Sequence, residues 1–211
     1  MEEKDVIYSR LCDALEGEGC PICTLTKEVV NNYVKSLLYE YVNDSHTAER
    51  IIKGGGFCNL HSWLLYSYQE VLGTAIIYKR LVGHYIKHMN SPLNSEVSCL
   101  VCNVETDAIK RYIQAFLKYL QNDAFYQKYM VSDGLCYPHL KMCINLANND
   151  QTKKALIELE RQRLEELSFQ LSEIIRKSDY RFQNELKGEE YRARYKAIEK
   201  LVGKKRGVSS L

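Results

Sequence analysis

CPICTLTKEVVNNYVKSLLYEYVND (residues 20–44) and CLVCNVETDAIKRYIQAFLKYLQND (residues 99–123) align without a gap at an offset of 79 residues. From the eleventh residue of each copy, apolar side chains recur at i, i+3, i+4, i+7, i+8 and i+11. That spacing places them on one face of an amphipathic helix. One residue out of register, GFCNLH (56–61) aligns with GLCYPH (134–139). The matched units predict a duplicated helical module.

Both copies predict the same order of elements. Cys-x-x-Cys opens a long helix, a short second helix follows, and Cys-x-x-His opens a third helix. Asp44 and Asp123 stand where the short helices need an N-cap, and Gly56 and Gly134 follow where a left-handed residue is expected. The expected helices are 24–42, 45–53 and 59–72 in the first copy, and 103–121, 124–131 and 137–147 in the second.

The eight cysteines favour metal ligation over a disulfide framework, because thiols in the cytosol are kept reduced. Two Cys-x-x-Cys pairs, each followed by Cys-x-x-His after 33 or 34 residues, are a specific metal signature. Pairing within each repeat is the default, and a swapped pairing between repeats stays open. The predicted ligand sets are Cys20, Cys23, Cys58 and His61 for one site, and Cys99, Cys102, Cys136 and His139 for the other.

Zinc is the metal that these sets favour, at two ions per chain, because it accepts tetrahedral thiolate and imidazole ligands. An iron–sulfur cluster is the alternative, since thiolates also hold clusters. Paired disulfides or buried thiols are the other reading of the same cysteines. Cys12 and Cys143 are expected to be small buried thiols outside the sites.

Composition is that of a globular chain. Its 211 residues are 45% hydrophobic and 27% charged, enough for one ordinary core or two small ones. The charged N-terminus precedes no apolar run, and no stretch is long enough for a membrane span. A cytoplasmic protein is therefore expected.

The repeat suggests three parts: a first metal-binding module at 1–90, a second at 91–150, and a C-terminal helical arm with a basic tail at 151–211. Residues 1–150 carry 14 basic against 17 acidic side chains, whereas residues 151–211 carry 15 against 10. Eight apolar residues of the arm, from Ala155 to Ile175, are expected to dock on the modules, with a dimer interface as the alternative. The fold class predicted is all-α.

No catalytic residues are predicted. The sequence contains no nucleophile–base pair, no phosphate-binding glycine loop and no dinucleotide fingerprint. The leading function is a non-enzymatic, zinc-stabilised scaffold or adaptor with a protein partner or a second copy of itself. The alternatives are an iron–sulfur or thiol-based redox or metal sensor, and a nucleic-acid or ribosome-associated factor. An enzyme would need an open metal position, which two complete ligand sets argue against.

The motifs GCPIC, LLYEYVND, GFCNLHSW and RKSDYRF…GEE…AIEKLVG occur in that order over about residues 8–203. Together they resemble an uncharacterised prokaryotic family of unknown function. The chain has Ser178 where members of that family often have His. The resemblance implies a cytosolic, bacterial or archaeal protein and adds no activity.

Overall fold

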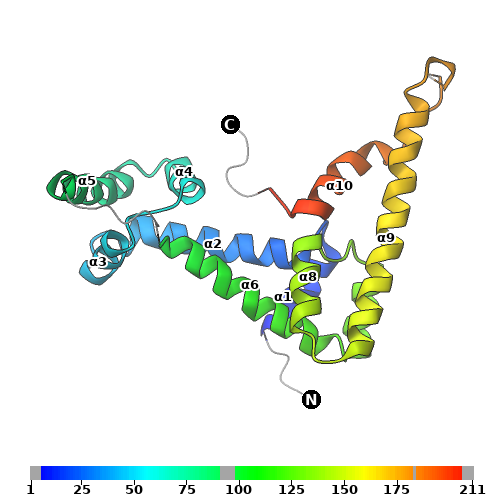
Figure 1. Cartoon of the computed structure of the whole chain (residues 1–211), viewed down its shortest axis with the longest axis horizontal. Coiled ribbons are helices and arrows are strands. Elements are labelled where there is room, and N and C mark those ends of the chain that lie inside the picture. The colour runs from blue at the N-terminus through cyan, green and yellow to red at the C-terminus, as the bar shows by residue number, and fades with distance from the viewer. Residues whose placement is uncertain (1–5, 91–97, 183, 206–211) are drawn as a thin grey trace. The chain divides into compact units, whose positions relative to one another are not determined.

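The computed structural model describes residues 6–90, 98–182 and 184–205, and over these ranges the chain is helical without any strand (Figure 1). The all-α prediction is confirmed. Contacts divide the chain into two compact units. Within the described residues, unit 1 comprises the chain up to residue 25 together with residues 110–205, and unit 2 comprises residues 26–109.

Two long helices take part in both units, α2 (Pro21–Tyr39) and α6 (Leu100–Tyr119). Unit 2 otherwise contains α3 (Ser45–Lys53), α4 (Asn59–Ser67) and α5 (Val71–His88). Unit 1 otherwise contains α1 (Val6–Glu16), α7 (Asp123–Val131), α8 (Tyr137–Leu146), α9 (Asp150–Lys177), the 3-10 helices η1 (Tyr180–Phe182) and η2 (Glu189–Arg192), and α10 (Ala193–Val202).

The duplication is visible in the order of helices, because α2, α3 and α4 correspond to α6, α7 and α8. The units do not coincide with the repeats. Each unit takes the start of one repeat's long helix and the third helix of the other repeat. The division at residues 90 and 150 follows the sequence repeat, and as a division into domains it stays a prediction.

The short helices are capped as the sequence suggests in one copy only. Asp44 caps α3 by accepting a hydrogen bond from the backbone N–H of Thr47 at 2.7 Å. In the second copy Asn122 is the N-cap, accepting from Phe125 N–H at 3.1 Å, and Asp123 is the first helical residue. The prediction for Asp123 was one residue too late, because the preceding asparagine is an equally good cap.

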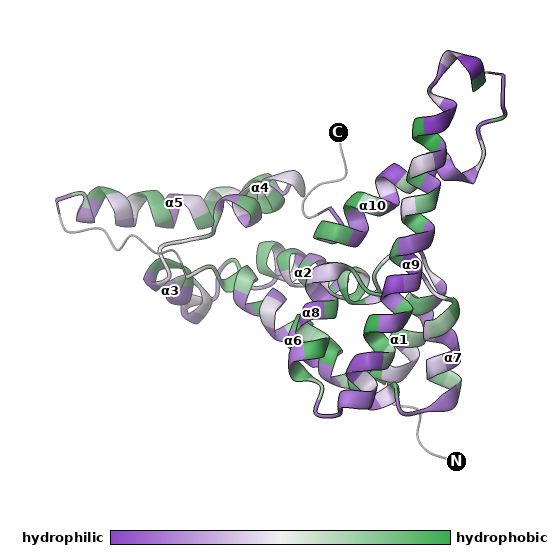
Figure 2. Ribbon diagram, turned by 45° about the vertical axis from the view of Figure 1, so that its right-hand side comes forward, coloured by the Kyte–Doolittle hydropathy of each residue, from purple (hydrophilic) through white to green (hydrophobic). Residues whose placement is uncertain are grey.

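Unit 2 has a core formed by the apolar face of α2 and the helices that follow it. Val34, Leu37 and Leu38 of α2 are buried there against Leu65 of α4 and Ile77 of α5. These α2 residues belong to the predicted i, i+3, i+4 stripe. The periodicity that predicted the helix therefore also identifies the face that it buries. Hydrophobic and hydrophilic residues alternate along the ribbon of α2 (Figure 2).

Unit 1 has an aromatic core. The ring of Tyr8 on α1 meets Tyr119 edge-on, with centroids 5.0 Å apart. Phe116 of α6 contacts Phe125 and Tyr129 of α7 at centroid distances of 5.7 Å and 5.1 Å. Edge-to-face pairs of this kind add to the stabilisation that burial gives. They fix α7 against α1 and the end of α6.

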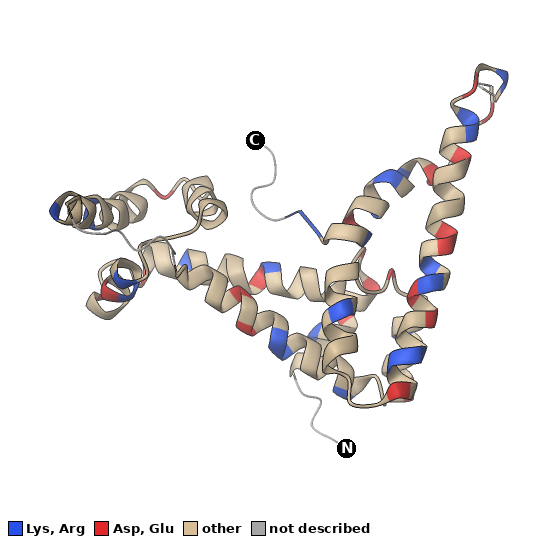
Figure 3. Ribbon diagram, viewed as in Figure 1, with Lys and Arg blue, Asp and Glu red and all other residues tan. Residues whose placement is uncertain are grey.

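The long helix of the arm is only partly buried. Along α9 the buried residues are Leu156 and Glu160, whereas Ile175 near its end is exposed. Charges of both signs are spread along this helix (Figure 3). Of the eight stripe residues, Leu156 is buried, six are partly buried and Ile175 is exposed, so docking through this stripe stays a prediction. The main anchor of the arm is polar.

That anchor is the carboxylate of Glu160, whose side chain is 1% exposed. Its Oε1 accepts hydrogen bonds from Tyr129 OH at 2.5 Å, Leu135 N–H at 2.8 Å and Arg163 Nη1 at 2.8 Å. Its Oε2 lies 2.5 Å from Lys200 Nζ in an ion pair that lacks hydrogen-bond geometry. One buried carboxylate thus joins α7, α9, α10 and the turn before α8.

No helix in the described ranges is both long enough and apolar enough to cross a membrane.

The Glu160 anchor makes a prediction about stability. Glu160→Ala leaves Arg163 and Lys200 without their shared counter-ion in a site where both are mostly buried. Breaking a buried pair in this way costs about 3–5 kcal/mol. Urea unfolding of the metal-replete protein, followed by circular dichroism, should show a loss of that size.

Glu158→Ala is the matched control, because Glu158 is an exposed residue of α9 whose contact with Arg161 measures 3.9 Å. Exposed pairs contribute about 0–1 kcal/mol. Equal losses for the two variants would show that Glu160 does not anchor the arm.

Candidate metal centres

All four Cys-x-x-Cys and Cys-x-x-His pairs occupy the same place on a helix. Cys58 is the N-cap of α4 and Cys136 is the N-cap of α8. Cys20 and Cys99 directly precede α2 and α6, and each accepts the first i+4 backbone hydrogen bond of its helix, at 3.2 Å. The second residue of each pair follows three positions later in the first turn.

This placement explains why the spacing is three. Residues three apart at a helix start lie on one face, so their side chains can converge on a single point. The sulfurs of Cys58 and Cys136 make no capping hydrogen bond to their own helices, which leaves both sulfurs available as ligands. The unpaired N–H groups of the first turn also favour negative charge, and therefore thiolates.

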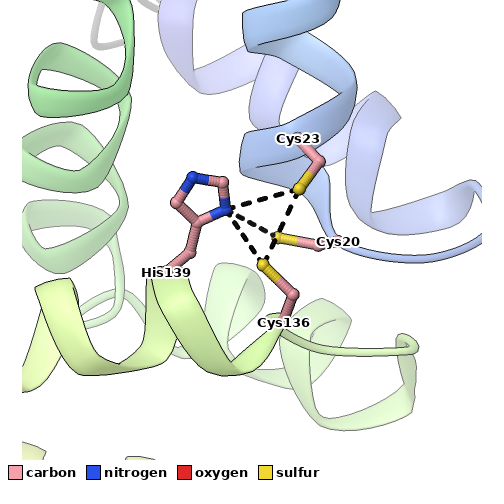
Figure 4. Close-up of side chains that lie close together, drawn as sticks. All are labelled: Cys20, Cys23, Cys136 and His139. Atoms are coloured by element: carbon pink, nitrogen blue, oxygen red, sulfur yellow. Dashed lines mark hydrogen bonds between the residues drawn. The ribbon is translucent and has the colours of Figure 1, made fainter. Parts of the chain in front are cut away.

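In unit 1 the starts of α2 and α8 meet, and their four side chains form one cluster (Figure 4). His139 Nδ1 lies 3.5 Å from Cys20 Sγ, 3.4 Å from Cys23 Sγ and 3.2 Å from Cys136 Sγ. The sulfurs of Cys23 and Cys136 are 3.7 Å apart. We call this group cluster 1.

In unit 2 the starts of α6 and α4 meet in the same way. His61 Nδ1 lies 3.3 Å from Cys58 Sγ, 3.5 Å from Cys99 Sγ and 3.3 Å from Cys102 Sγ. The sulfurs of Cys58 and Cys102 are 3.6 Å apart. We call this group cluster 2. Its histidine presents the same ring nitrogen as the histidine of cluster 1.

These distances fit a single tetrahedral ion. With metal–sulfur bonds of about 2.3 Å and metal–nitrogen bonds of about 2.0 Å, tetrahedral ligand atoms stand about 3.8 Å apart for two sulfurs and about 3.5 Å apart for sulfur and nitrogen. The observed separations are 3.6–3.7 Å and 3.2–3.5 Å. All eight cysteines are free, so disulfides do not account for the short distances. Both clusters could hold a metal ion.

The pairing corrects our expectation that each repeat would supply one complete set. Cys20 and Cys23 of the first repeat join Cys136 and His139 of the second, while Cys99 and Cys102 join Cys58 and His61. The reason lies in helix length. A 19-residue helix such as α2 rises about 28 Å, and nine further residues of helix rise about 13 Å. The third helix therefore begins too far from the Cys-x-x-Cys pair of its own repeat.

Hydrogen bonds donated by backbone N–H groups hold each pair of helix starts together. In unit 2, Ser98 N–H donates to the Gly54 carbonyl at 2.8 Å, just before Cys99. A Cβ on Gly54 would come within 2.4 Å of the Ser98 oxygen, so this approach requires glycine. In unit 1, Gly19 N–H donates to Asp133 Oδ2 at 2.7 Å, just before Cys20. The residue before each Cys-x-x-Cys thus binds the loop before the partner Cys-x-x-His.

Cluster 1 is also covered by the end of the arm. Gly203 terminates α10 with φ +88°, and a Cβ there would lie 3.4 Å from Cys23 Sγ and 3.7 Å from Cys136 Sγ. A side chain at this position would be strained by the positive φ, whereas its Cβ would only contact the two sulfurs. The glycine in the AIEKLVG motif therefore has a structural reason that the sequence analysis did not find.

The thiols and imidazoles perturb one another strongly. Burial raises the pKa of Cys20 well above its usual value, while hydrogen bonds with Cys136 and Cys20 lower the pKa of Cys23 far below it. Burial and contact with Cys58 raise the pKa of Cys102 to about 12. Burial opposes protonation of His139, but its contacts with Cys136 and Cys23 raise its pKa to about 9. The thiols and the imidazole of each cluster compete for protons. A divalent cation bound there would displace those protons.

Sequence reasoning missed one residue beside cluster 2. Glu105 Oε2 lies 3.8 Å from His61 Nε2, the ring nitrogen that faces away from the sulfurs, and its side chain is 15% exposed. A carboxylate behind a ligating histidine orients the ring and raises its basicity. The available signal was position, since Glu105 follows Cys102 by one helical turn. Comparison of the two repeats does not reveal Glu105, because Thr26 occupies the matching position in α2.

Cys12 and Cys143 lie outside both clusters and are buried, as predicted for small core thiols. Burial raises the pKa of Cys143 to about 12, which keeps this thiol protonated at neutral pH.

Double substitutions test the exchanged pairing. Cys20→Ser with Cys136→Ser removes two residues of one cluster and should cost one bound metal per chain. Cys20→Ser with Cys58→Ser removes one residue from each cluster and should cost both. Pairing within repeats would give the reverse result. Metal analysis of purified protein checks this, with Cys143→Ala as a control that should retain both metals.

A family described as "Family of unknown function (DUF6062)" matches residues 3–97 and again residues 87–207, ranges that follow the two repeats. A curated relative, "Uncharacterized 23.9 kDa protein in xynA 3′region" from Caldicellulosiruptor sp. (strain Rt8B.4), is 26% identical over 202 residues, covering 92% of this chain and 99% of the relative. No solved structure matches the chain. The resemblance inferred from the motifs is therefore confirmed, and the chain belongs to the DUF6062 family.

Proposed function

We propose that the protein is a zinc-stabilised helical scaffold that binds another macromolecule. The observation that carries the proposal is the geometry of clusters 1 and 2, in which three sulfurs and one imidazole nitrogen lie within 4.8 Å of one another and the nitrogen lies 3.2–3.5 Å from every sulfur. The eight proposed ligands are Cys20, Cys23, Cys136 and His139 in cluster 1, and Cys58, His61, Cys99 and Cys102 in cluster 2.

Zinc is the ion that this donor set favours. Three thiolates and one imidazole are typical of structural zinc sites, where all four positions come from protein. An iron–sulfur cluster binds its ligands through different irons, which spreads the ligand atoms apart. Separations of 3.2–3.7 Å instead support one ion for each cluster.

Filled coordination shells support a structural role. Zinc in an enzyme keeps one position for water or substrate, and a four-ligand site does not. When bound, zinc would supply a crosslink of large free energy, because structural zinc contributes about 10–16 kcal/mol in small peptides, as much as the stability of a whole domain. Cys20, Cys23, Cys136 and His139 would cross-link α2 to α8, and the other four residues would cross-link α6 to α4.

A protein partner is favoured over nucleic acid. Nucleic-acid binding requires basic side chains that are free to meet phosphates. In the arm, Arg176 is held by Glu173 and Glu185, and Lys177 is held by Glu190. On α4, Trp63 and Tyr66 are exposed with their rings 5.9 Å apart, and aromatic pairs of this kind are enriched at protein interfaces. We place the protein in the cytoplasm, where thiols remain available for zinc.

The first test is metal content and its link to folding. The purified protein should contain two zinc ions per chain and be colourless. Prolonged chelation should remove the helical circular-dichroism signal, because the crosslinks between helix starts are lost. An absorption band near about 400 nm with iron and sulfide would favour a cluster. A chelated chain that keeps its helical signal would contradict the structural role.

Glu105→Gln tests whether the carboxylate supports the zinc site of cluster 2. Loss of a partner behind a ligating histidine lowers metal affinity by about 10- to 100-fold. The measurement is a competitive chelator titration in a Cys136→Ser background, so that cluster 2 alone retains its full ligand set. The amide removes the charge while keeping the shape.

Asp107→Asn provides the control for this test. It removes the same charge from the exposed side of α6, two residues further along the helix. Its zinc affinity should equal that of the Cys136→Ser background. If the two variants lower zinc affinity equally, Glu105 acts through its negative charge alone and not through its contact with His61.

A further inference from the structure

Unit 1 contains a cavity of about 360 Å³ whose wall includes Cys20 and Cys136, two of the four residues of cluster 1. Small-molecule sites occupy about 300–1,000 Å³, so its size suits a small ligand. One face of α9 and one face of α10 form its walls, and the loops at Gly19 and Asp133 also line it. The α9 side chains in the wall follow the spacing of one helix face, i, i+3, i+4, i+7, i+8 and i+11: Leu159, Gln162, Arg163, Glu166, Leu167 and Gln170.

The orientation of α10 is unusual for a helix packed against its neighbours. Its apolar residues Ile198, Leu201 and Val202 are 63%, 56% and 69% exposed. The face that it turns to the cavity carries an aromatic ring and charged groups: Arg192 of η2, then Tyr195, Lys196, Glu199 and Lys200. An amphipathic helix ordinarily packs its apolar stripe inward. The inverted arrangement places polar groups of α10 in a cavity wall that is otherwise mostly apolar.

Each basic side chain that lines the cavity already takes part in an ion pair, and Arg163 and Lys200 share the single carboxylate of Glu160. Arg163 Nη2 also donates to the Tyr129 carbonyl at 2.5 Å, which fixes the guanidinium against the wall. An anionic ligand would have to displace these internal partners. The ion pairs are Arg163 and Lys200 with Glu160, Arg192 with Glu18, and Lys196 with Asp133.

Two carboxylates in the cavity wall are not neutralised in this way. Glu166 on α9 accepts a hydrogen bond from Gln170 Nε2 at 2.9 Å, and Glu199 on α10 accepts one from Tyr195 OH at 2.8 Å. Both donors are neutral. Within the described residues neither carboxylate has a basic side chain within ion-pair distance. Glu166 and Glu199 are therefore the two carboxylates of the wall that can accept hydrogen bonds from a cationic ligand.

We propose that this cavity binds a small organic cation, an amine or guanidine on a short carbon chain. Glu166 and Glu199 would each bind a cationic end through charge-assisted hydrogen bonds. The walls supplied by Leu159, Leu167 and the Tyr195 ring suit the carbon chain, and the ring also attracts a cation. A hard metal ion fits less well, because it needs several oxygens around one point.

The test uses the full-length, metal-replete protein and isothermal titration calorimetry with spermidine and agmatine at physiological ionic strength. One saturable site per chain is expected for at least one of these amines. Hexanediol and adipate, which are matched in length but neutral and anionic, should not bind. Glu166→Gln and Glu199→Gln should each weaken binding by about tenfold or more, the effect of losing one hydrogen bond to a charged group.

Glu165→Gln is the control, since Glu165 is exposed on α9 next to Glu166 and does not line the cavity. It should leave amine binding unchanged. Binding of adipate, equal weakening by all three substitutions, or no saturable amine site would each overturn the proposal. Metal analysis of every variant separates this result from the zinc assignment, because Glu166 and Glu199 belong to neither cluster.

Discussion

The structure depends on the convergence of two helix starts on one point. A four-ligand metal site cannot be built from one Cys-x-x-Cys or one Cys-x-x-His pair, since each supplies two side chains from one turn of helix. Each cluster is completed by a second helix start, α8 for α2 and α4 for α6. The loop contacts at Gly19 and Gly54 follow from this requirement, because both bring together the segments that precede the ligands. The glycine at 203 lies against two of the sulfurs, where its positive φ ends α10.

The sequence identified the residues that form the clusters but not their partners. Periodicity and the Cys-x-x-Cys and Cys-x-x-His spacings are local, and local patterns correctly predicted the long helices and the positions of the ligands at helix starts. Pairing is a property of the tertiary structure. The two spacings of 33 and 34 residues suggested a self-contained repeat, whereas the length of α2 prevents the Cys-x-x-Cys and Cys-x-x-His pairs of one repeat from meeting. Helix length, combined with the position of ligands at helix starts, would have predicted the exchange.

The arm was the least predictable part, for a different physical reason. Its apolar residues suggested a docking stripe, but they gave no sign that a buried carboxylate positions the helix or that α10 turns its apolar residues outward. Burial of Glu160 is stabilising only because Tyr129, Arg163 and Lys200 all meet it, and those residues lie on three helices. Arg163 stands at the helical i+3 spacing from Glu160, but no spacing in the sequence connects Tyr129 or Lys200 with it. The contact of Glu105 could not be predicted for the same reason, because its partner His61 lies on another helix.

The exchange of ligands between repeats gives the two clusters very different spans along the chain. The ligand set of cluster 2 is complete once the chain reaches Cys102, whereas that of cluster 1 joins Cys20 to His139. Closing the longer loop costs little more entropy, since that cost grows only with the logarithm of loop length. The larger difference is that cluster 1 brings distant parts of the chain into one unit, and α10 covers it through Gly203. An ion in cluster 1 would therefore connect the start of α2 with the start of α8 across more than half of the chain, and one in cluster 2 would connect segments that lie closer in sequence.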